Sequence, residues 1–464
     1  MKKTLSLLMI LVLLSITTLS SCIGLQLTEK IETAEEALMK ISETMESVSS
    51  FRGETTLDIV GNVDLKSFHL EATAITVAQL SNDGFTYYYD QENLTMSYQD
   101  EVTDAKNITA FNDGKYFYLG KKGNSEKRFF SYCTEKEFND FYKNTTESEI
   151  GFVDGYSKSS FVKNDSGSYT VILEDYDEET INFLNNMYGM PYEENGGKIT
   201  DMVVTLTADS NFRITAIEFD YSFSDTAFSG SQTTFYSNYD SAEKILDILS
   251  PDTYTEVGDA KAISLYSHLV SQKKAKASDT FTFSSSQQKT VGNIANEESL
   301  ETDIISYGMQ NGSYYFTIES DVNGVKETIT YRNGEYKKDG ALVNDDYSDY
   351  EAKSVINGFI EPLAITYNDI ANVICNSTAG STVYTFEIDN QDLDILLTQI
   401  YQSSGATYYG SDISVEMAVK DYELVSLKCI IKARGDIKIS YYSSSYSVNI
   451  ETTVEFSEQV TPDL

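Results

Sequence analysis

The chain has 464 residues, of which 41% are hydrophobic, and it carries a formal net charge of −38. This length allows two or three domains with cores of their own, and the apolar fraction argues against wholesale disorder. The negative charge repels nucleic acid and anionic lipid headgroups. We therefore predict no nucleic-acid partner and expect any membrane attachment to come from something other than the protein surface.

The chain begins with the three-part layout of an export signal. Lys2 and Lys3 precede an apolar run from Leu5 to Leu14, and small and hydroxyl residues then lead to Cys22. The apolar run is shorter than the stretch of about 20 residues that a membrane-spanning helix needs. This layout predicts a cleaved signal peptide over residues 1–21.

The stretch Leu19-Ser20-Ser21-Cys22 resembles the lipobox of bacterial lipoproteins. In that family the cysteine sulfur receives a diacylglyceryl group, and the signal is cut just before this cysteine. The resemblance implies that Cys22 is the first mature residue and holds the protein to the outer face of a cell membrane. Residues 22–30 are then a short lipidated tether. The alternative is an ordinary cleaved signal that happens to end near a cysteine.

A helix and then several strands are expected after the tether. Thr33 and Glu36 form a capping-box pattern. Around this pattern, apolar residues recur every three or four positions, at Ile31, Ala34, Leu38, Ile41, Met45 and Val48. Short alternating runs such as 85–89 and 314–318 follow, separated by Asn-Gly and Asp-Gly pairs. Such pairs favour tight hairpins, so we predict antiparallel, locally connected strands.

Two halves of the chain repeat one another. The turn Asp113–Tyr116 corresponds to Asn333–Tyr336, and the run Tyr169–Leu173 corresponds to Tyr384–Ile388. In each half an acidic stretch, a helix and two long strands follow. The predicted helices contain Leu184 and Leu397. This period is too long for a solenoid unit and predicts two copies of one domain.

The boundary between the copies is predicted near Pro251, which ends an expected helix over 242–249 because proline cannot donate a hydrogen bond inside a helix. Asp259 is then a suitable N-cap for the first helix of the second copy. The predicted domains are residues 31–255 and 256–464.

The residue types limit the chemistry of the chain. Its two histidines, His69 and His268, fall in separate halves, and HExxH, GxSxG and Gly-rich phosphate loops do not occur in the sequence. We predict structural or solvent-exposed histidines, with no catalytic residue, metal or cofactor. Besides Cys22, the cysteines are Cys133, Cys375 and Cys429. We expect buried free thiols, or a single Cys375–Cys429 bridge as the alternative.

The order of helix, antiparallel strands, acidic turn with helix, and long closing strands resembles the LolA/LppX-like lipoproteins and carriers. This resemblance implies an α+β fold class, with two similar domains that are each a curved antiparallel half-barrel sheet covered by helices. Members of the family hold acyl chains or lipid-linked molecules between sheet and helices. Five apolar residues are candidates for lining such a cavity, with plain core packing as the alternative: Leu38, Ile41, Met45, Leu184 and Leu397.

These features favour a membrane-anchored extracytoplasmic lipoprotein that binds or carries an apolar or amphipathic ligand without catalysing a reaction. One alternative is a structural or adhesive protein of the cell envelope that has no ligand cavity. A hydrolase with a carboxylate pair ranks last, because acidic residues are so abundant that any one pair is uninformative.

Overall fold

The computed structural model describes residues 31–63, 66–98, 101–146, 155–178, 180–181, 184, 198–225, 227–266, 269, 281–292, 297–310, 313–322, 324–344, 347–348, 351–352, 355, 365, 367–378, 381–388, 406–438 and 445–458. The predicted signal peptide, Cys22 and the tether lie outside the described residues, as do His268 and Leu397. The chain divides into two compact units, Met1–Glu256 and Val257–Leu464.

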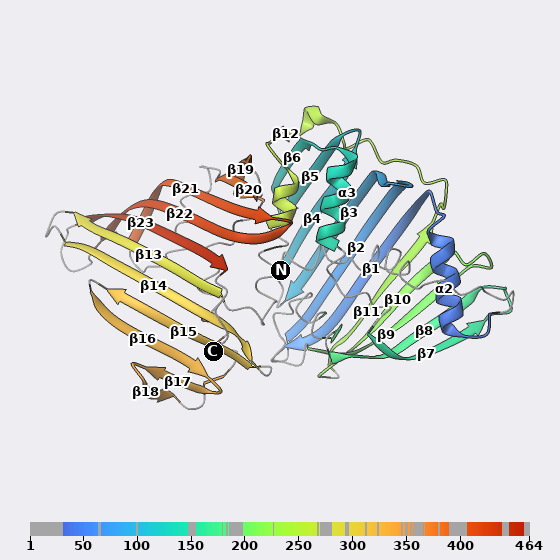
Figure 1. Cartoon of the computed structure of the whole chain (residues 1–464), viewed down its shortest axis with the longest axis horizontal. Helices are drawn as coiled ribbons and strands as arrows, with labels where there is room; N and C mark the ends of the chain where they lie inside the picture. Colours follow the sequence, from blue (N-terminus) through green and yellow to red (C-terminus); the bar gives the residue numbers. More distant parts are fainter. Residues whose placement is uncertain are drawn as a thin grey trace. The chain divides into compact units, whose positions relative to one another are not determined.

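The first unit contains a twelve-stranded sheet (Figure 1). Its strands are β1 (Ser50–Val63), β2 (Lys66–Ser81), β3 (Gly84–Tyr98), β4 (Glu101–Asn112), β5 (Lys115–Lys122), β6 (Ser125–Tyr132), β7 (Tyr156–Lys163), β8 (Tyr169–Tyr176), β9 (Ile199–Ala208), β10 (Ile214–Phe223), β11 (Ser229–Ser237) and β12 (Thr255–Glu256). The strand order across the sheet is β12-β6-β5-β4-β3-β2-β1-β11-β10-β9-β8-β7. Every pair is antiparallel except β12 with β6, which is parallel.

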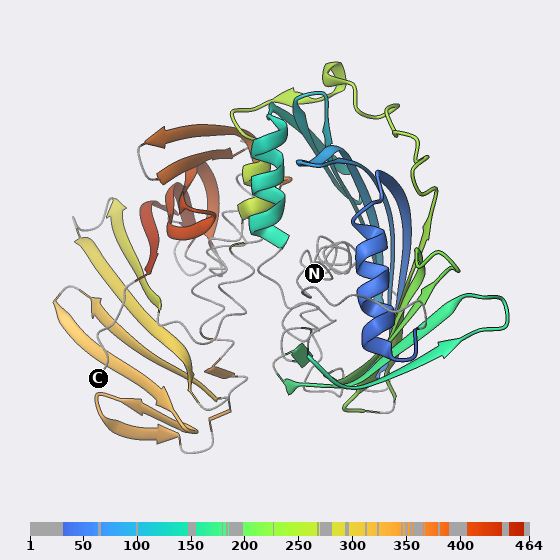
Figure 2. The same cartoon turned by 45° about the vertical axis from the view of Figure 1, so that its right-hand side comes forward.

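Two helices lie against the same face of this sheet (Figure 2), which we call the helix face. Helix α2 (Ala34–Met45) contacts β7 and β8, and α3 (Glu135–Thr146) contacts β3. The α2 prediction is confirmed, since the Thr33 hydroxyl accepts a hydrogen bond from the Glu36 N–H at 3.2 Å. The Glu36 carboxylate accepts from the N–H of Glu32 rather than from that of Thr33.

Helix α3 begins with a complete capping box, which was not among the predicted features. The Thr134 hydroxyl accepts from the Glu137 N–H at 3.2 Å, and the Glu137 carboxylate accepts from the Thr134 N–H at 2.7 Å. Behind the cap, the Phe138 ring stacks on Phe111 of β4 with their centroids 4.7 Å apart. The reciprocal cap and the buried ring together fix α3 to the sheet.

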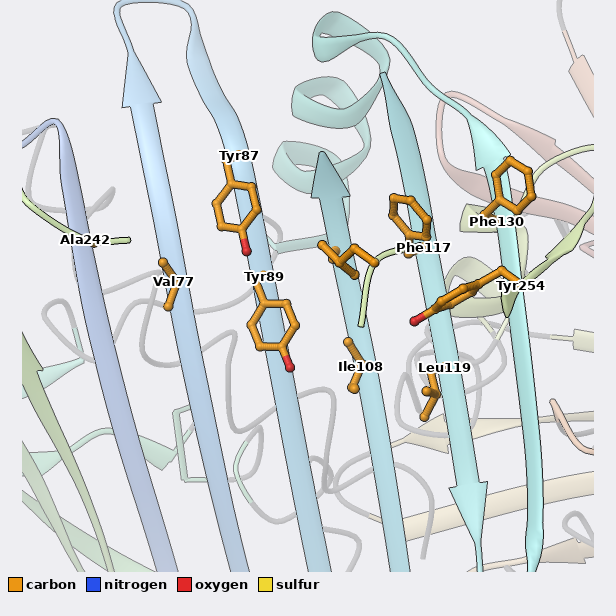
Figure 3. Packing of buried hydrophobic residues seen from close by; sticks show 11 residues of the cluster. Val77, Tyr87, Tyr89, Ile108, Phe117, Leu119, Phe130, Ala242 and Tyr254 are labelled. Atoms are coloured by element: carbon orange, nitrogen blue, oxygen red, sulfur yellow. The ribbon is translucent and has the colours of Figure 1, made fainter. Parts of the chain in front are cut away.

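The opposite face of β2 to β6 is covered by an irregular segment, residues 238–254, which we call the strap. The strap also contains the short 3-10 helix η3 (Pro251–Thr253). We call the sheet face beneath it the strap face, and Figure 3 shows the cluster buried there. Its members are Val77, Tyr87, Tyr89, Ile108, Ala110, Phe117, Leu119 and Phe130 of the sheet, with Ala242, Leu249 and Tyr254 of the strap.

The predicted helix over 242–249 is therefore wrong. Its apolar residues have helical spacing, but the Tyr87 hydroxyl accepts from the Ile245 N–H at 2.8 Å and donates to the Ile245 carbonyl at 2.9 Å. Both backbone groups that a helix would use at this position are thus bonded to a side chain of the sheet. Contact with the strap face overrides the local helical pattern.

The second unit contains an eleven-stranded sheet. Its strands are β13 (Phe281–Gly292), β14 (Glu297–Gln310), β15 (Ser313–Val322), β16 (Val325–Arg332), β17 (Glu335–Lys338), β18 (Ala341–Asn344), β19 (Ile370–Thr378), β20 (Ser381–Ile388), β21 (Ala406–Lys420), β22 (Glu423–Lys438) and β23 (Ser445–Glu458). Their order is β18-β17-β16-β15-β14-β13-β23-β22-β21-β20-β19. Apart from β12, the first sheet has the same order and the same connections between strands.

Local details agree between the two sheets. Asp113-Gly114 joins β4 to β5 and Asn333-Gly334 joins β16 to β17, and all four residues have positive φ. Ser348 and Glu351 form a reciprocal capping box like the one that opens α3. A helical stretch at 261–266 follows Asp259, whose carboxylate accepts from the Lys261 N–H at 3.0 Å. The predicted hairpins and the predicted cap at Asp259 are confirmed.

The predicted α+β class, with each sheet covered by helices, is wrong. The chain is mainly β, and in its described part the helices α2 and α3 cover only parts of one sheet face. The physical reason is that β2 to β6 are apolar on both faces, and their second apolar face is buried by the irregular strap. Within the described residues, the helical periodicity at 242–249 belongs to the irregular strap and not to a helix.

Cys375 is a half-buried free thiol, so the Cys375–Cys429 bridge does not form. Cys133 is buried, and its thiol lies 3.5 Å from the Thr134 carbonyl oxygen. The side chain of Cys429 is outside the described part of the structure.

Candidate functional site

Two acidic side chains lie side by side on the helix face of the first sheet. Asp90 and Glu92 of β3 are only 5% and 3% exposed. Because strand residues two apart point to the same side, both acids share the face on which Tyr88 lies. The strand register places Thr76 and Thr109 on either side of Asp90, and Asn107 beside Glu92. The result is a small polar patch in the middle of the sheet.

The oxygen atoms of this patch lack the donors that buried acceptors normally have. Within the described residues, Asp90 Oδ1, Glu92 Oε1 and Asn107 Oδ1 are buried without a hydrogen-bond partner. Most buried polar side-chain atoms in folded proteins are hydrogen-bonded, and each that is not costs about 1–3 kcal/mol. Three such acceptors together are therefore a feature that packing alone does not explain.

Burial controls the charge of the patch. It raises the pKa of Asp90 well above the usual range, and it does the same for Glu92, where the nearby Asp90 charge raises the pKa further. Burial and the charge of Asp90 also raise the pKa of Tyr88. Burial therefore favours the protonated, neutral form of both acids when no partner is present.

The remainder of the helix face around the patch is aromatic on one side and aliphatic on the other. Tyr88 lies 5.6 Å from Phe138 and 5.5 Å from Tyr142 of α3, measured between ring centroids. Farther along β3 the same face carries Leu94, which is buried and pairs with Ala72 of β2. The patch thus places a few polar groups within an apolar face of the sheet, which is the combination of residues that typically lines ligand sites.

The second unit has no equivalent acids. Phe111 lies two residues before the Asp113-Gly114 turn and pairs with Tyr88, just as Tyr331 pairs with Phe316 before the corresponding turn. This register places Ile318 at the position of Asp90 and Ser320 at the position of Glu92. The paired acids are therefore a property of the first unit and are not required by the topology.

The residues predicted to line a cavity have varied positions. Helix α2 lies on β7 and β8 and carries three of them, all buried: Leu38, Ile41 and Met45. Leu184 is also buried, in a short helical stretch after β8, whereas Leu397 lies outside the described residues. The structure does not bring the α2 residues together with the acid pair, since α2 contacts β7 and β8 at one end of the sheet and five strands separate β8 from β3.

Sequence reasoning missed Asp90 and Glu92, although a signal was present. Two acids at positions i and i+2 of an alternating strand must share a face with Tyr88 and Leu94, which are apolar in character. His69, in contrast, is an exposed side chain 2.9 Å from Asp58 Oδ1, as expected for a solvated histidine.

Metal centres and membrane-spanning helices are two further kinds of feature that concern the described part of the chain. No three His, Cys, Asp or Glu side chains gather there in a way that could hold a metal ion. None of the helices in those residues is both long and apolar enough to span a membrane.

Comparisons with known proteins do not place the chain in a family. No family model matches the sequence, and no curated protein is detectably similar to it. Among solved structures, CghA with Sch210972 is 7% identical over 88% of each chain, with a TM-score of 0.12. The translocator domain of the autotransporter NalP from Neisseria meningitidis is 6% identical over 88% of each chain, with a TM-score of 0.11. A porin-like protein from Bacteroides uniformis is 10% identical over 88% of this chain and 96% of its own, with a TM-score of 0.10.

Proposed function

We propose that the protein is an extracytoplasmic lipoprotein that binds an amphipathic ligand on the helix face of its first unit, without catalysing a reaction. The observation that carries the binding proposal is the buried pair Asp90 and Glu92, whose oxygens lack partners in the described residues. The proposed anchor is a lipid on Cys22, and it is supported by the basic start, the short apolar run and the Leu-Ser-Ser-Cys stretch.

The binding argument rests on the free energy of the buried patch. Unpaired buried acceptors lower the stability of the fold, while their replacement by Ile318 and Ser320 in the second unit shows that the same topology accepts other residues. A ligand that hydrogen-bonds to Asp90 and Glu92 would recover this lost free energy on binding. Its apolar part would contact neighbouring side chains such as Leu94.

Calorimetry with three amphiphiles tests the proposal. The probes are dodecanol, dodecanoic acid and dodecylamine, which share one alkyl chain and differ in the polar group. The test variant is Asp90→Ile with Glu92→Ser, because it places the residues of the second unit in the first and keeps the strand pattern. We expect at least one probe to bind the wild type tenfold or more tightly than this variant. Equal binding of all three probes to both proteins, or no binding, would contradict the proposal.

The matched control for this variant is Glu71→Gln, since Glu71 is an exposed residue on the other face of neighbouring β2. It removes one acid without touching the patch, so its affinities should equal those of the wild type.

The anchor has its own test. In cells fed an alkyne analogue of palmitate, we expect the wild type to be labelled and to remain with the membrane fraction. Cys22→Ala should lose the label and be released, whereas Cys133→Ala should keep both properties. Labelling of the Cys22→Ala variant would show that the lipid is attached elsewhere.

A further inference from the structure

The cross-strand neighbours of the acid pair leave its charge unbalanced. On the helix face, Asp90 is flanked by Thr76 and Thr109, and Glu92 is flanked by Ala74 and Asn107. None of these neighbours carries a positive charge, so in the described strands no Lys, Arg or His stands directly opposite either acid. Elsewhere in the first unit, acids do have such partners, for example Asp240 with Arg213 at 2.5 Å.

The unpartnered atoms of the patch are all acceptors. Asp90 Oδ1, Glu92 Oε1 and Asn107 Oδ1 each need a donor, and the first two gain a negative charge when their protons leave. Residues two apart on one strand face are about 7 Å from each other, so a single small donor group can reach both carboxyl groups. A group with several N–H donors and a positive charge satisfies this arrangement best.

We infer that the ligand carries a primary ammonium group that binds between Asp90 and Glu92. This inference rests on the proposed function. An ammonium has three N–H donors, which equals the number of unpartnered acceptors in the patch. Tyr88 lies two residues before Asp90 on the same face of β3, so an aromatic ring stands beside the proposed ammonium site. The alkyl part of the ligand then contacts the aliphatic side of the patch around Leu94.

The bound state differs from the empty state by one or two protons. Without a ligand, burial raises the pKa of Asp90 and of Glu92 and so favours the carboxylic acid form of both. When the ammonium binds, each carboxylic acid that ionises loses one proton to the buffer and becomes a carboxylate that accepts from N–H. The ammonium keeps its own protons. Binding is therefore accompanied by proton release and becomes up to tenfold tighter per pH unit for each proton released, below the pKa of the amine.

The test measures dodecylamine binding by calorimetry in phosphate and in Tris, two buffers with different heats of ionisation. We expect dodecylamine to bind at least tenfold more tightly than dodecanol, with release of one to two protons. The variant Asp90→Asn with Glu92→Gln keeps the size of both side chains and should lose both the preference and the proton release. Glu71→Gln should retain them.

The outcomes separate this inference from the proposed function. If dodecanol or dodecanoic acid binds through the patch but dodecylamine binds no more tightly than they do, the ammonium inference is wrong and the proposed function stands. The same conclusion follows if a probe binds through the patch and dodecylamine binding releases no proton. If none of the three probes distinguishes the wild type from the Asp90→Ile, Glu92→Ser variant, both are wrong. Proton release is measured on the wild type, so this part of the test does not depend on the folding of any variant.

Discussion

The stability of the first unit should fall as the pH rises from acidic to neutral, because Asp90 and Glu92 are buried. Burial raises the pKa of both carboxyl groups in the folded chain, whereas both ionise near pH 4 when the chain is unfolded. Between the unfolded and the folded pKa values, the unfolded chain has lost protons that the folded chain retains. The contribution of the protonated acids to the free energy of unfolding is fully present below the unfolded pKa. It is lost as the pH rises toward the folded pKa.

The size of this effect follows from proton linkage. Each acid that is protonated in the folded state and ionised in the unfolded state lowers the free energy of unfolding by about 1.4 kcal/mol per pH unit. While both acids meet this condition, the combined slope is about 3 kcal/mol per pH unit. This is a large part of the total stability of about 5–15 kcal/mol that is usual for a domain. The variant Asp90→Asn with Glu92→Gln should lack this slope and be more stable than the wild type at neutral pH.

Urea unfolding followed by far-UV circular dichroism measures the slope, since the chain has no Trp for fluorescence. Titrations between about pH 5 and about pH 7 compare the wild type, the double variant and the Glu71→Gln control. The unfolding transition that responds to the double substitution belongs to the first unit. The same pH dependence in the wild type and the double variant would refute the reasoning, because the acids would then be solvated in the folded chain.

Three further predictions test the packing of the first unit. Tyr87→Phe removes the hydroxyl that bonds the N–H and carbonyl of Ile245, so we expect a loss of about 2 kcal/mol in urea unfolding and faster proteolysis within the strap. Gly61→Val would place a Cβ 2.3 Å from the Phe228 ring and should destabilise the unit by about 1–3 kcal/mol. Adding Phe228→Ala should make the combined loss smaller than the sum of the two single losses. Phe138→Ala empties the contact between α3 and the sheet and should lower the free energy of unfolding by about 3–5 kcal/mol.

Each of these predictions has an outcome that would contradict it. Unchanged proteolysis of the strap in Tyr87→Phe would mean that apolar contacts alone hold the strap. Strict additivity of the Gly61 and Phe228 substitutions would show that the ring does not press on the strand. A loss of less than about 1 kcal/mol in Phe138→Ala would indicate that α3 is not part of the core.

Features that depend on a few neighbouring residues were predictable from the sequence. The cap of α2 at Thr33 and the positive-φ turns at Asp113-Gly114 and Asn333-Gly334 form as expected. Each depends on short-range hydrogen bonds or on the conformations that Asp, Asn and Gly tolerate, and these act wherever the segment lies in the fold. The Thr134–Glu137 capping box belongs to the same class and was predictable, although it was overlooked.

The helix content was overestimated because helical spacing does not reveal what covers a surface. The strap has apolar residues at helical intervals, yet the Tyr87 hydroxyl bonds its backbone and the segment stays irregular. The sequences of the two halves differ at the positions that decide whether a sheet face needs a cover. Where the first sheet has Ala110 and Phe117 on its strap face, the second has Thr330 and Lys337 in the same register. At these described positions the first sheet has an apolar second face that needs a cover, whereas the second sheet is polar.

The sequence by itself determined the caps, the hairpin turns and the alternation of the strands, because these depend on local backbone geometry. Only the tertiary structure decided which strand faces are covered, what covers them and which polar groups are buried as a result. Asp90 and Glu92 are ordinary acids in the sequence. The sheet register and burial on the helix face raise their pKa values and leave them without described partners, because the dielectric surroundings of a side chain depend on residues far away in the chain.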